Sequence, residues 1–374
     1  MKASNIASAS TRFGFKLFLE LLRKGKGWNI LISPTSIAAA LAMTYNGAMG
    51  DTKRGMEETL ELQGMSFEEV NRENAALIAG LKEIDSVQIN IANSLWGKKD
   101  VPFNPDFIQR NRDFYEAGVR NLDFSDPRSI SIINAWVSEK TAGLIKKIVD
   151  EIDPLTILIL INAIYFKGKW SNVFNKADTK EGLFTLLDGK QKNVHFMSQS
   201  GRYPYHRGRD FQAISLPYGD GRVSMYIFLP DKKVDFYGFL NNFNLDLLHQ
   251  FSTEKGAIKL PRFKLEYSIS LNDALKSLGM EVAFDEDKAD FSGMCPVTSQ
   301  DNVYIYKVVH KSFMEVNEEG TEAGAATKVE MNTRALLGPP PFNMVVDHPF
   351  FCVLRDNATD AILFMGAVVD PSVM

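Results

Sequence analysis

Residues 318–335 read EEGTEAGAATKVEMNTRA, and this stretch combines the composition of a loop with the pattern of a strand. Small residues dominate from Gly320 to Thr327, which is typical of an exposed loop. Read with a period of two, one set is uncharged and small or apolar: Thr321, Ala323, Ala325, Thr327, Val329 and Met331. The other set contains all the charged residues between 321 and 332, and its members are Glu322, Gly324, Ala326, Lys328, Glu330 and Asn332. That alternation indicates a strand with one buried face.

A segment that has to exist both as a loop and as a strand carries both signals. Taken alone, the pattern fits a plain strand or a frayed Ala-rich helix as well as it fits such a two-state segment. If residues 320–334 became extended, their 15 residues would span about 50 Å, at about 3.3 Å per residue.

The composition of the whole chain is that of an ordinary globular protein. Its 374 residues are 45% hydrophobic and 24% charged, which excludes disordered and collagen-like classes. The 42 basic and 46 acidic residues give a net charge of −4, which does not favour nucleic-acid or anionic-membrane partners. The apolar runs 157–161 and 37–43 are too short to cross a bilayer, and the first ten residues do not resemble a signal peptide.

The order of predicted elements indicates an α+β fold. Helical periodicity covers residues 15–22, a helix capped by Thr35 or Ser36 runs to Gly47, and another is expected over 134–149. Strands are predicted over 28–32, 155–166, 223–229 and 264–271, followed by a short helix over 273–278 and a hairpin formed by 350–354 and 362–369. No linker or repeat divides the chain.

Motifs of enzyme chemistry are missing from the sequence. The five histidines form no HExxH pair, and neither a G-x-S-x-G elbow nor a phosphate-binding loop occurs. Cys295 and Cys352 lack metal-ligand spacing and are interpreted as buried thiols. Two basic clusters are interpreted as solvated faces rather than polyanion sites: Arg23, Lys24 and Lys26, and Arg202, His206, Arg207 and Arg209. We therefore expect no catalytic residue, metal or cofactor.

From about Asn5 to Pro371, the chain resembles the serpins, the serine-protease-inhibitor superfamily. The matching blocks, in order, are NILISPTS (29–36), LINAIYFKGKW (160–170), VHKSFMEVNEEGTEA (309–323), DHPF (347–350) and FMGAVVDP (364–371). The resemblance implies a single domain over 1–374, with three β-sheets, eight or nine helices and a reactive-centre loop at about 318–341.

The resemblance also implies a function. A serpin is an inhibitor and not an enzyme: the target serine protease cleaves the loop, forms a covalent acyl-enzyme, and is trapped when the loop inserts into the main sheet. We expect a monomer with no nucleic-acid or membrane partner, secreted by family habit, while a cytoplasmic location stays open. A non-inhibitory serpin and an unrelated hydrolase are the alternatives.

Family spacing assigns roles within the loop. The hinge and inserting segment comprises Glu318, Glu319, Gly320, Thr321, Glu322, Ala323, Gly324, Ala325, Ala326 and Thr327. Counting 16 positions beyond Glu318 gives Arg334–Ala335 as the scissile bond, which suits a trypsin-like protease. Leu336 and Leu337 are alternative bait residues, which would suit chymotrypsin- or elastase-like proteases.

The resemblance also implies that residues outside the loop support the conformational change. Ser33, Ser36, Asn162 and His310 match a polar cluster under the main sheet, in which His310 is expected to form hydrogen bonds. Trp170 matches the tryptophan at the point where the loop first enters the sheet.

Overall fold

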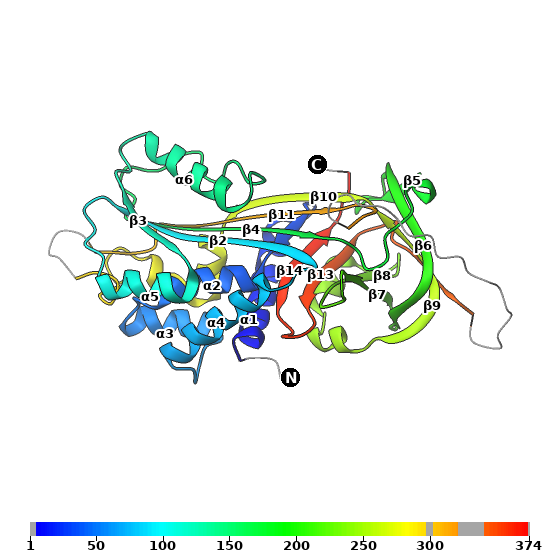
Figure 1. Cartoon of the computed structure of the whole chain (residues 1–374), viewed down its shortest axis with the longest axis horizontal. Helices are drawn as coiled ribbons and strands as arrows, with labels where there is room; N and C mark the ends of the chain where they lie inside the picture. Colours follow the sequence, from blue (N-terminus) through cyan, green and yellow to red (C-terminus); the bar gives the residue numbers. More distant parts are fainter. Residues whose placement is uncertain (1–4, 297–301, 321–339, 373–374) are drawn as a thin grey trace.

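The computed structural model describes residues 5–296, 302–320 and 340–372. These residues form an elongated molecule in which long strands run along its length and helices cover both faces (Figure 1). Eight α-helices occur among them: α1 (Asn5–Lys24), α2 (Pro34–Tyr45), α3 (Gly50–Thr59), α4 (Phe67–Lys82), α5 (Pro105–Tyr115), α6 (Arg128–Lys140), α7 (Phe236–Asn241) and α8 (Asn272–Leu275). The predicted α+β class is confirmed.

The strands form two hydrogen-bonded sheets. The five-stranded sheet has the order β10 (Phe263–Ser270), β11 (Lys307–Val316), β4 (Leu158–Gly168), β2 (Val87–Lys98) and β3 (Gly118–Leu122). The nine-stranded sheet has the order β1 (Ile30–Ile32), β14 (Ile362–Val368), β13 (Phe350–Asp356), β8 (Val223–Pro230), β7 (Phe211–Tyr218), β6 (Gln191–Arg207), β9 (Ser252–Pro261) and β12 (Phe342–Val345), with β5 (Lys180–Thr185) on β6. The resemblance implied three sheets; here the 17-residue strand β6 pairs with β5, β7 and β9 and joins their strands into one sheet.

Local sequence explains where α2 begins. Ser33 is its N-cap and accepts a hydrogen bond from the backbone N–H of Ser36, while Pro34 occupies the first turn, where a missing N–H costs nothing. The predicted cap at Thr35 or Ser36 is therefore wrong by two or three residues, because the Ser-Pro pair itself starts the helix.

The helix predicted over 134–149 is wrong in its second half. Helix α6 ends at Lys140 because Ala142 and Gly143 both adopt positive φ angles, 52° and 79°. The Asn134 side chain then accepts bonds from the backbone N–H groups of Ile148 and Val149 and folds this segment back along the helix.

Strands β2 and β3 were not predicted, and they lie between the helix predicted to end at Gly47 and the one predicted over 134–149. Residues 92–97 of β2 are all buried, so the strand lacks the two-residue alternation of a half-buried strand. Tertiary contacts with β4 and β3 on either side define it instead.

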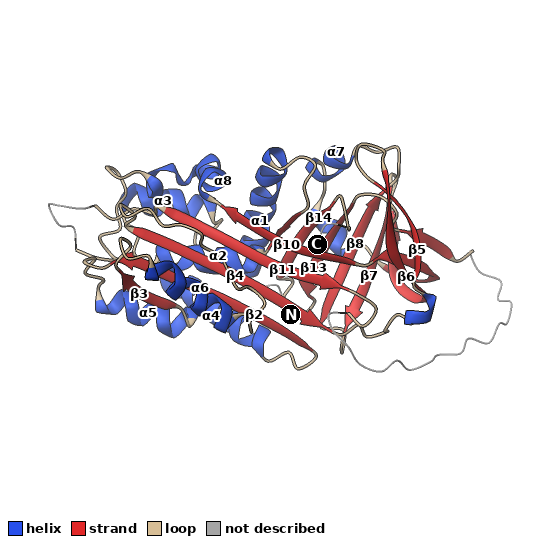
Figure 2. Ribbon diagram, turned by 90° about the horizontal axis from the view of Figure 1, so that it is seen from above, coloured by secondary structure: helices blue, strands red, loops and turns tan. Residues whose placement is uncertain are grey.

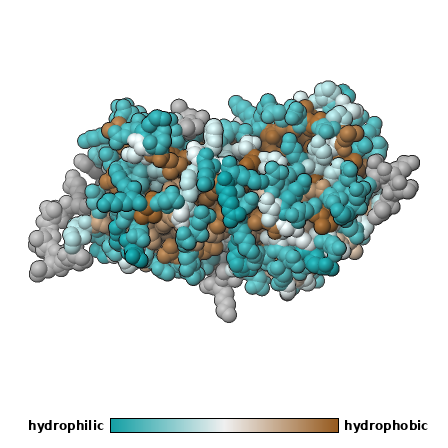
Figure 3. Space-filling view, turned by 180° about the vertical axis from the view of Figure 1, so that it is seen from behind, coloured by the Kyte–Doolittle hydropathy of each residue, from teal (hydrophilic) through white to brown (hydrophobic). Residues whose placement is uncertain are grey.

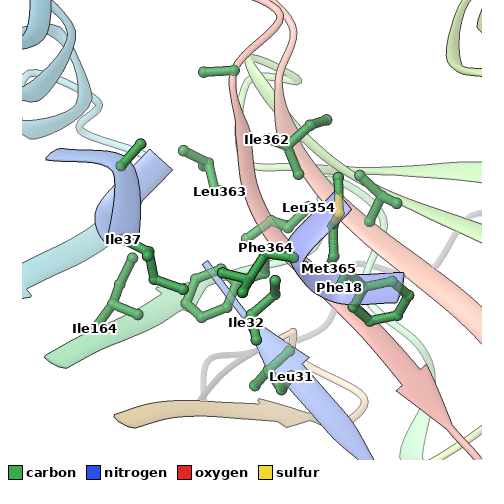
Figure 4. Packing of buried hydrophobic residues seen from close by; sticks show 14 of the residues in the cluster. Phe18, Leu31, Ile32, Ile37, Ile164, Leu354, Ile362, Leu363, Phe364 and Met365 are labelled. Atoms are coloured by element: carbon green, nitrogen blue, oxygen red, sulfur yellow. The ribbon is translucent and has the colours of Figure 1, made fainter. Parts of the chain in front are cut away.

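The main hydrophobic core lies where helices meet both sheets. Phe18 of α1, Ile37 of α2 and Ile164 of β4 converge there on β1, β13 and β14 (Figure 4). A second cluster lies between α6 and the other face of the five-stranded sheet, where Ile133 and Val137 meet Trp96 and Phe313. The central strands of that sheet are therefore covered on both faces, as Figure 2 shows for α6.

Hydrophilic residues dominate the face seen in Figure 3, and the hydrophobic ones lie in separate groups. Among the helices of the described residues, none offers an apolar stretch of the length that a bilayer crossing requires. Cys295 and Cys352 are both free and buried, as predicted.

Candidate functional site

The candidate site is the seam between β4 and β11, the two parallel strands at the centre of the five-stranded sheet. Their register runs from Lys307 opposite Ile159 to Phe313 opposite Tyr165. Both strands continue for three residues beyond this last pair, over 166–168 and 314–316. The seam therefore opens at the end where β11 leads into the predicted hinge, residues 318–320.

Glu318 anchors the hinge just outside this opening. Its side chain is buried, yet its carboxylate accepts hydrogen bonds from Arg262 (Nε to Oε1, 2.7 Å) and from the Thr179 hydroxyl. Burial alone would raise the pKa of Glu318, but the bonds from Arg262 and Thr179 outweigh it and hold the pKa below its ordinary value. Its backbone carbonyl accepts a bond from the Phe174 N–H at 2.8 Å, which ties β11 to the segment that follows β4.

Glu319 and Gly320 continue the anchor. The Glu319 carbonyl accepts a bond from the Trp170 N–H (3.0 Å), and its carboxylate pairs with Lys176 at 2.5 Å. Gly320 has a φ of +111°, and a Cβ there would lie 2.2 Å from the carbonyl oxygen of Gly168 and 2.6 Å from the nitrogen of Trp170. Both contacts are with backbone that cannot swing aside, so only glycine fits this position.

Trp170 lies directly beside the hinge. Its indole N–H donates to the carbonyl of Asn317 (2.9 Å), and its ring stacks on Tyr218 with centroids 4.1 Å apart. The structure thus places the residue predicted for loop insertion against the first hinge residues. We name Glu318, Glu319, Gly320, Arg262 and Trp170 the hinge anchor.

A second group of residues, polar and buried, meets halfway along the seam. Asn93 of β2, Asn162 of β4 and His310 of β11 lie opposite one another in a single row across the sheet. The Asn162 amide nitrogen contacts the Ser36 carbonyl (3.1 Å), the Ser36 hydroxyl (2.6 Å) and the Asn93 side-chain oxygen (2.6 Å). These four side chains are fully or almost fully buried, and we name them the polar cluster.

The cluster fixes the protonation of His310. Because the Ser36 carbonyl can only accept, the Asn162 nitrogen must face it, and the Asn162 oxygen then faces His310 Nδ1 at 2.5 Å. Nδ1 therefore carries the proton, and Nε2 has no hydrogen-bond partner among the described residues. Burial lowers the pKa of His310 to about 3, so the ring is neutral at physiological pH.

Sequence reasoning found most of this site but not all of it. Ser36, Asn162 and His310 are in direct contact, whereas Ser33 joins them only by capping the backbone of Ser36. Asn93 was missed; the pair Asn93-Ser94 inside the buried stretch of β2 is the signal that could have shown it. Arg262 and Thr179 were also missed, and nothing in the sequence points to them.

The remaining predicted residues lie outside the described part of the chain. They are Thr321, Glu322, Ala323, Gly324, Ala325, Ala326 and Thr327 of the inserting segment, with Arg334 and Ala335 of the predicted bond and the alternatives Leu336 and Leu337. Within the described ranges, no group of three histidine, cysteine or acidic residues is arranged to hold a metal ion.

Comparison with known proteins agrees with the geometry. The family model described as "Serpin (serine protease inhibitor)" matches residues 8–371. Leukocyte elastase inhibitor from Homo sapiens is 37% identical over 98% of this chain and 99% of its own length, and human serpin B8 is 37% identical over 98% and 100%. The crystal structure of the thermophilic serpin tengpin in its native state has a TM-score of 0.89 at 32% identity, covering 99% of this chain and all of that one.

These matches extend over almost the whole chain and confirm the fold that the resemblance implied. The family model covers residues 8–371, and the human relative matches over nearly its whole length. The solved serpin shares the three-dimensional fold of this chain. The chain belongs to the serpin family.

Proposed function

We propose that this protein inhibits serine proteases as a suicide substrate, by inserting its cleaved loop between β4 and β11. The observation that carries the proposal is the direction of these strands. Because β4 and β11 are parallel neighbours, a segment that reverses at the end of β11 runs antiparallel to both of them. Such a segment could therefore pair on both sides if the two strands part.

The position of the opening supports the same proposal. The parallel ladder between β4 and β11 ends at Tyr165 and Phe313, three residues before the end of each strand, so separation can begin close to where the loop begins. The inserted strand would gain a ladder of backbone hydrogen bonds on each side and bury its uncharged set of side chains. The uncleaved protein is then a kinetically trapped state that releases free energy after cleavage.

The target is proposed to be an elastase- or chymotrypsin-like protease. The family spacing gives Arg334 as the bait, which would suit a trypsin-like enzyme, but a relative 37% identical to this chain is named leukocyte elastase inhibitor. Leu336 and Leu337 lie two and three residues beyond Arg334, and an apolar specificity pocket would accept either of them. We therefore place the scissile bond after Leu336 or Leu337.

Incubation with elastase, chymotrypsin and trypsin, followed by a denaturing gel, tests the proposal. We expect a detergent-stable covalent complex with one of the first two enzymes, and mass spectrometry of the released peptide should place the cut after a leucine. A complex with trypsin alone, cut after Arg334, would overturn the choice of target. Clean cleavage without any complex would indicate a non-inhibitory serpin.

A pair of substitutions tests the insertion step itself. Thr321→Arg puts a charge on the face of the strand that is expected to be buried, where an unpaired charge costs several kcal/mol, on the order of 3 or more. We expect this variant to be cleaved as a substrate and to trap little protease. Glu322→Arg, one residue along on the charged face, is the matched control and should still trap protease with a stoichiometry near that of the unchanged protein.

A further inference from the structure

The exposed face of the sheet next to the loop carries an unusual pairing of charges. Arg202 of β6 and Lys255 of β9 lie directly opposite each other in the antiparallel register, and both are exposed. Side chains in that arrangement have Cβ atoms about 5 Å apart, so like charges repel and destabilise the strand pair. Lys259 lies on the same face, further along β9, with its ammonium group 4.8 Å from the centre of the Phe196 ring.

No opposite charge offsets these three residues. Among the described residues, none forms an ion pair with Arg202, Lys255 or Lys259, and the neighbouring positions on this face, Ser198, Ser200, Pro204, Thr253 and Ala257, are all uncharged. The nearby Arg207, in contrast, has a partner of opposite charge: it donates two hydrogen bonds, of 2.8 and 2.7 Å, to Asp231. We name Arg202, Lys255 and Lys259 the basic strip.

The basic strip lies beside the strand into which the reactive loop runs. β12 begins at Phe342 and pairs with β9, with Phe342 opposite Gly256, the residue next to Lys255. The Phe342 ring crosses Gly256 and stacks on Tyr205 of β6, with centroids 4.0 Å apart. The chain that leaves the bait is therefore fastened to the two strands that carry the basic strip, at the right-hand end of Figure 1.

The distance from the bait to β12 allows a bound protease to reach this face. From Arg334 or Leu337 to Phe342 there are eight or five residues, so the bait bond lies within about 30 Å of β12 even if the chain is fully extended. A protease domain of about 250 residues has a radius of gyration of about 18 Å. A protease held at the bait is therefore close enough to reach β6 and β9.

We propose that the basic strip is a docking surface for the target protease and selects a protease whose surface beside its cleft is acidic. This inference rests on the proposed function and adds a second determinant of specificity to the bait residue. Complementary charges act mainly on the rate of encounter, because they steer the approach of the two proteins and are screened by salt. The repulsion between Arg202 and Lys255 in the free inhibitor is relieved when carboxylates of the protease approach.

The test compares association rate constants for two chymotrypsin-like proteases, one with an acidic and one with a basic surface around the cleft. For the acidic protease at low ionic strength, the double variant Arg202→Glu/Lys255→Glu should associate roughly tenfold more slowly than the unchanged inhibitor. For the basic protease it should associate faster, and both differences should shrink as salt is added. The control Lys99→Glu/Arg112→Glu makes the same change of charge near β3 and α5, at the opposite end of the molecule, and should leave both rates unchanged.

A stability measurement completes the test. Lys255→Glu alone places opposite charges across the strand pair, so its thermal midpoint should equal or exceed that of the unchanged protein. Equal association rates for the double variant and the control with both proteases would overturn the inference. In that case covalent complexes would still form on the gel, whereas failure of the proposed function would leave no complex with any protease.

Discussion

The hinge anchor and the polar cluster hold the same seam by different physical means. The hinge anchor is ionic and lies at the end of the sheet, where Arg262 is 42% exposed. The polar cluster is neutral, lies halfway along the seam, and is shut off from water on all sides. From this difference and the proposed function we infer two separate tasks: the anchor restrains the hinge, and the cluster keeps β4 and β11 together until a cleaved segment enters between them.

Removal of the Asn162 side chain should lower the stability of the protein more than any other substitution proposed here. Asn162→Ala leaves buried groups of Ser36, Asn93 and His310 without partners, which should lower the free energy of unfolding by on the order of 4 kcal/mol. Guanidinium unfolding of the uncleaved protein measures this. The control Asn90→Ala removes an amide from a less buried position of β2 and should cost less than about 1 kcal/mol. Similar losses for the two variants would contradict the role given to the cluster.

Gly320→Ala should cause the second largest loss of stability, because its Cβ would collide with backbone on both sides. We expect a loss of about 3 kcal/mol, combining the positive φ angle with the displacement of Gly168 and Trp170. Gly189 is the matched control, since it also has a positive φ of +82° but nothing within 4 Å of the added Cβ. Gly189→Ala should therefore cost only about 1 kcal/mol. Equal costs would show that the close approach at the hinge does not matter.

The neutral cluster predicts a specific dependence on pH. Because burial lowers the pKa of His310 in the folded protein to about 3, only the unfolded chain takes up a proton as the pH falls below about 6.5. Stability should therefore fall from pH 6.5 downward, by on the order of 2 kcal/mol at pH 5. His310→Gln should be less stable at pH 7.5 but should lose less on acidification over this range. Parallel pH profiles for the two proteins would contradict this explanation.

Loss of the ionic anchor should have the smallest effect on stability. Glu318→Gln weakens the bonds to Arg262 and Thr179 and should cost about 1 kcal/mol, because Arg262 is partly solvated. Its effect on function should be clearer, since a looser hinge allows the uncleaved loop to insert and the inhibitor to lose activity faster on storage. Glu61→Gln, which affects a carboxylate paired with Arg12 and Lys16 on α1, is the control and should not change that rate.

The hinge anchor should lose its contribution to stability in a different pH range from the polar cluster. The pKa of Glu318 is lowered in the folded protein, so its stabilisation is present above the ordinary glutamate pKa of about 4.5 and is lost as the pH falls below it. The cluster loses its contribution at higher pH than the anchor does. A single transition common to the unchanged protein, His310→Gln and Glu318→Gln would contradict the separation of the two regions.

The sequence predicted the parts of this molecule that depend on local pattern. The strands over 223–229 and 264–271 and the closing hairpin were found by periodicity, and they match β8, β10, β13 and β14 within about two residues. Helix α6 was placed too far along the chain, because the turn at 142–143 depends on backbone angles that Ala142 rarely adopts.

The sequence predicted the site residues that belong to recognisable sequence blocks. It did not predict the residues that reach the site only because distant segments pack together. His310 and Asn162 stood out through the family blocks, but Asn93 reaches them only through the register of β2 on β4. Arg262 and Glu318 are 56 positions apart, and their ion pair depends on how β10 approaches the end of β11. Contacts of this kind come from the packing of the sheet and have no local signature.

Loop insertion is tested most directly by comparing thermal unfolding before and after cleavage of the loop. If the cleaved segment becomes a strand between β4 and β11, the nicked protein should unfold at a temperature higher by tens of degrees than the intact protein. Hydrogen exchange should slow at the same time in residues 166–168 and 314–316, which the intact seam leaves beyond its last pair. If the unfolding curves of the intact and nicked proteins superimpose, the loop does not enter the sheet and the proposed insertion is wrong.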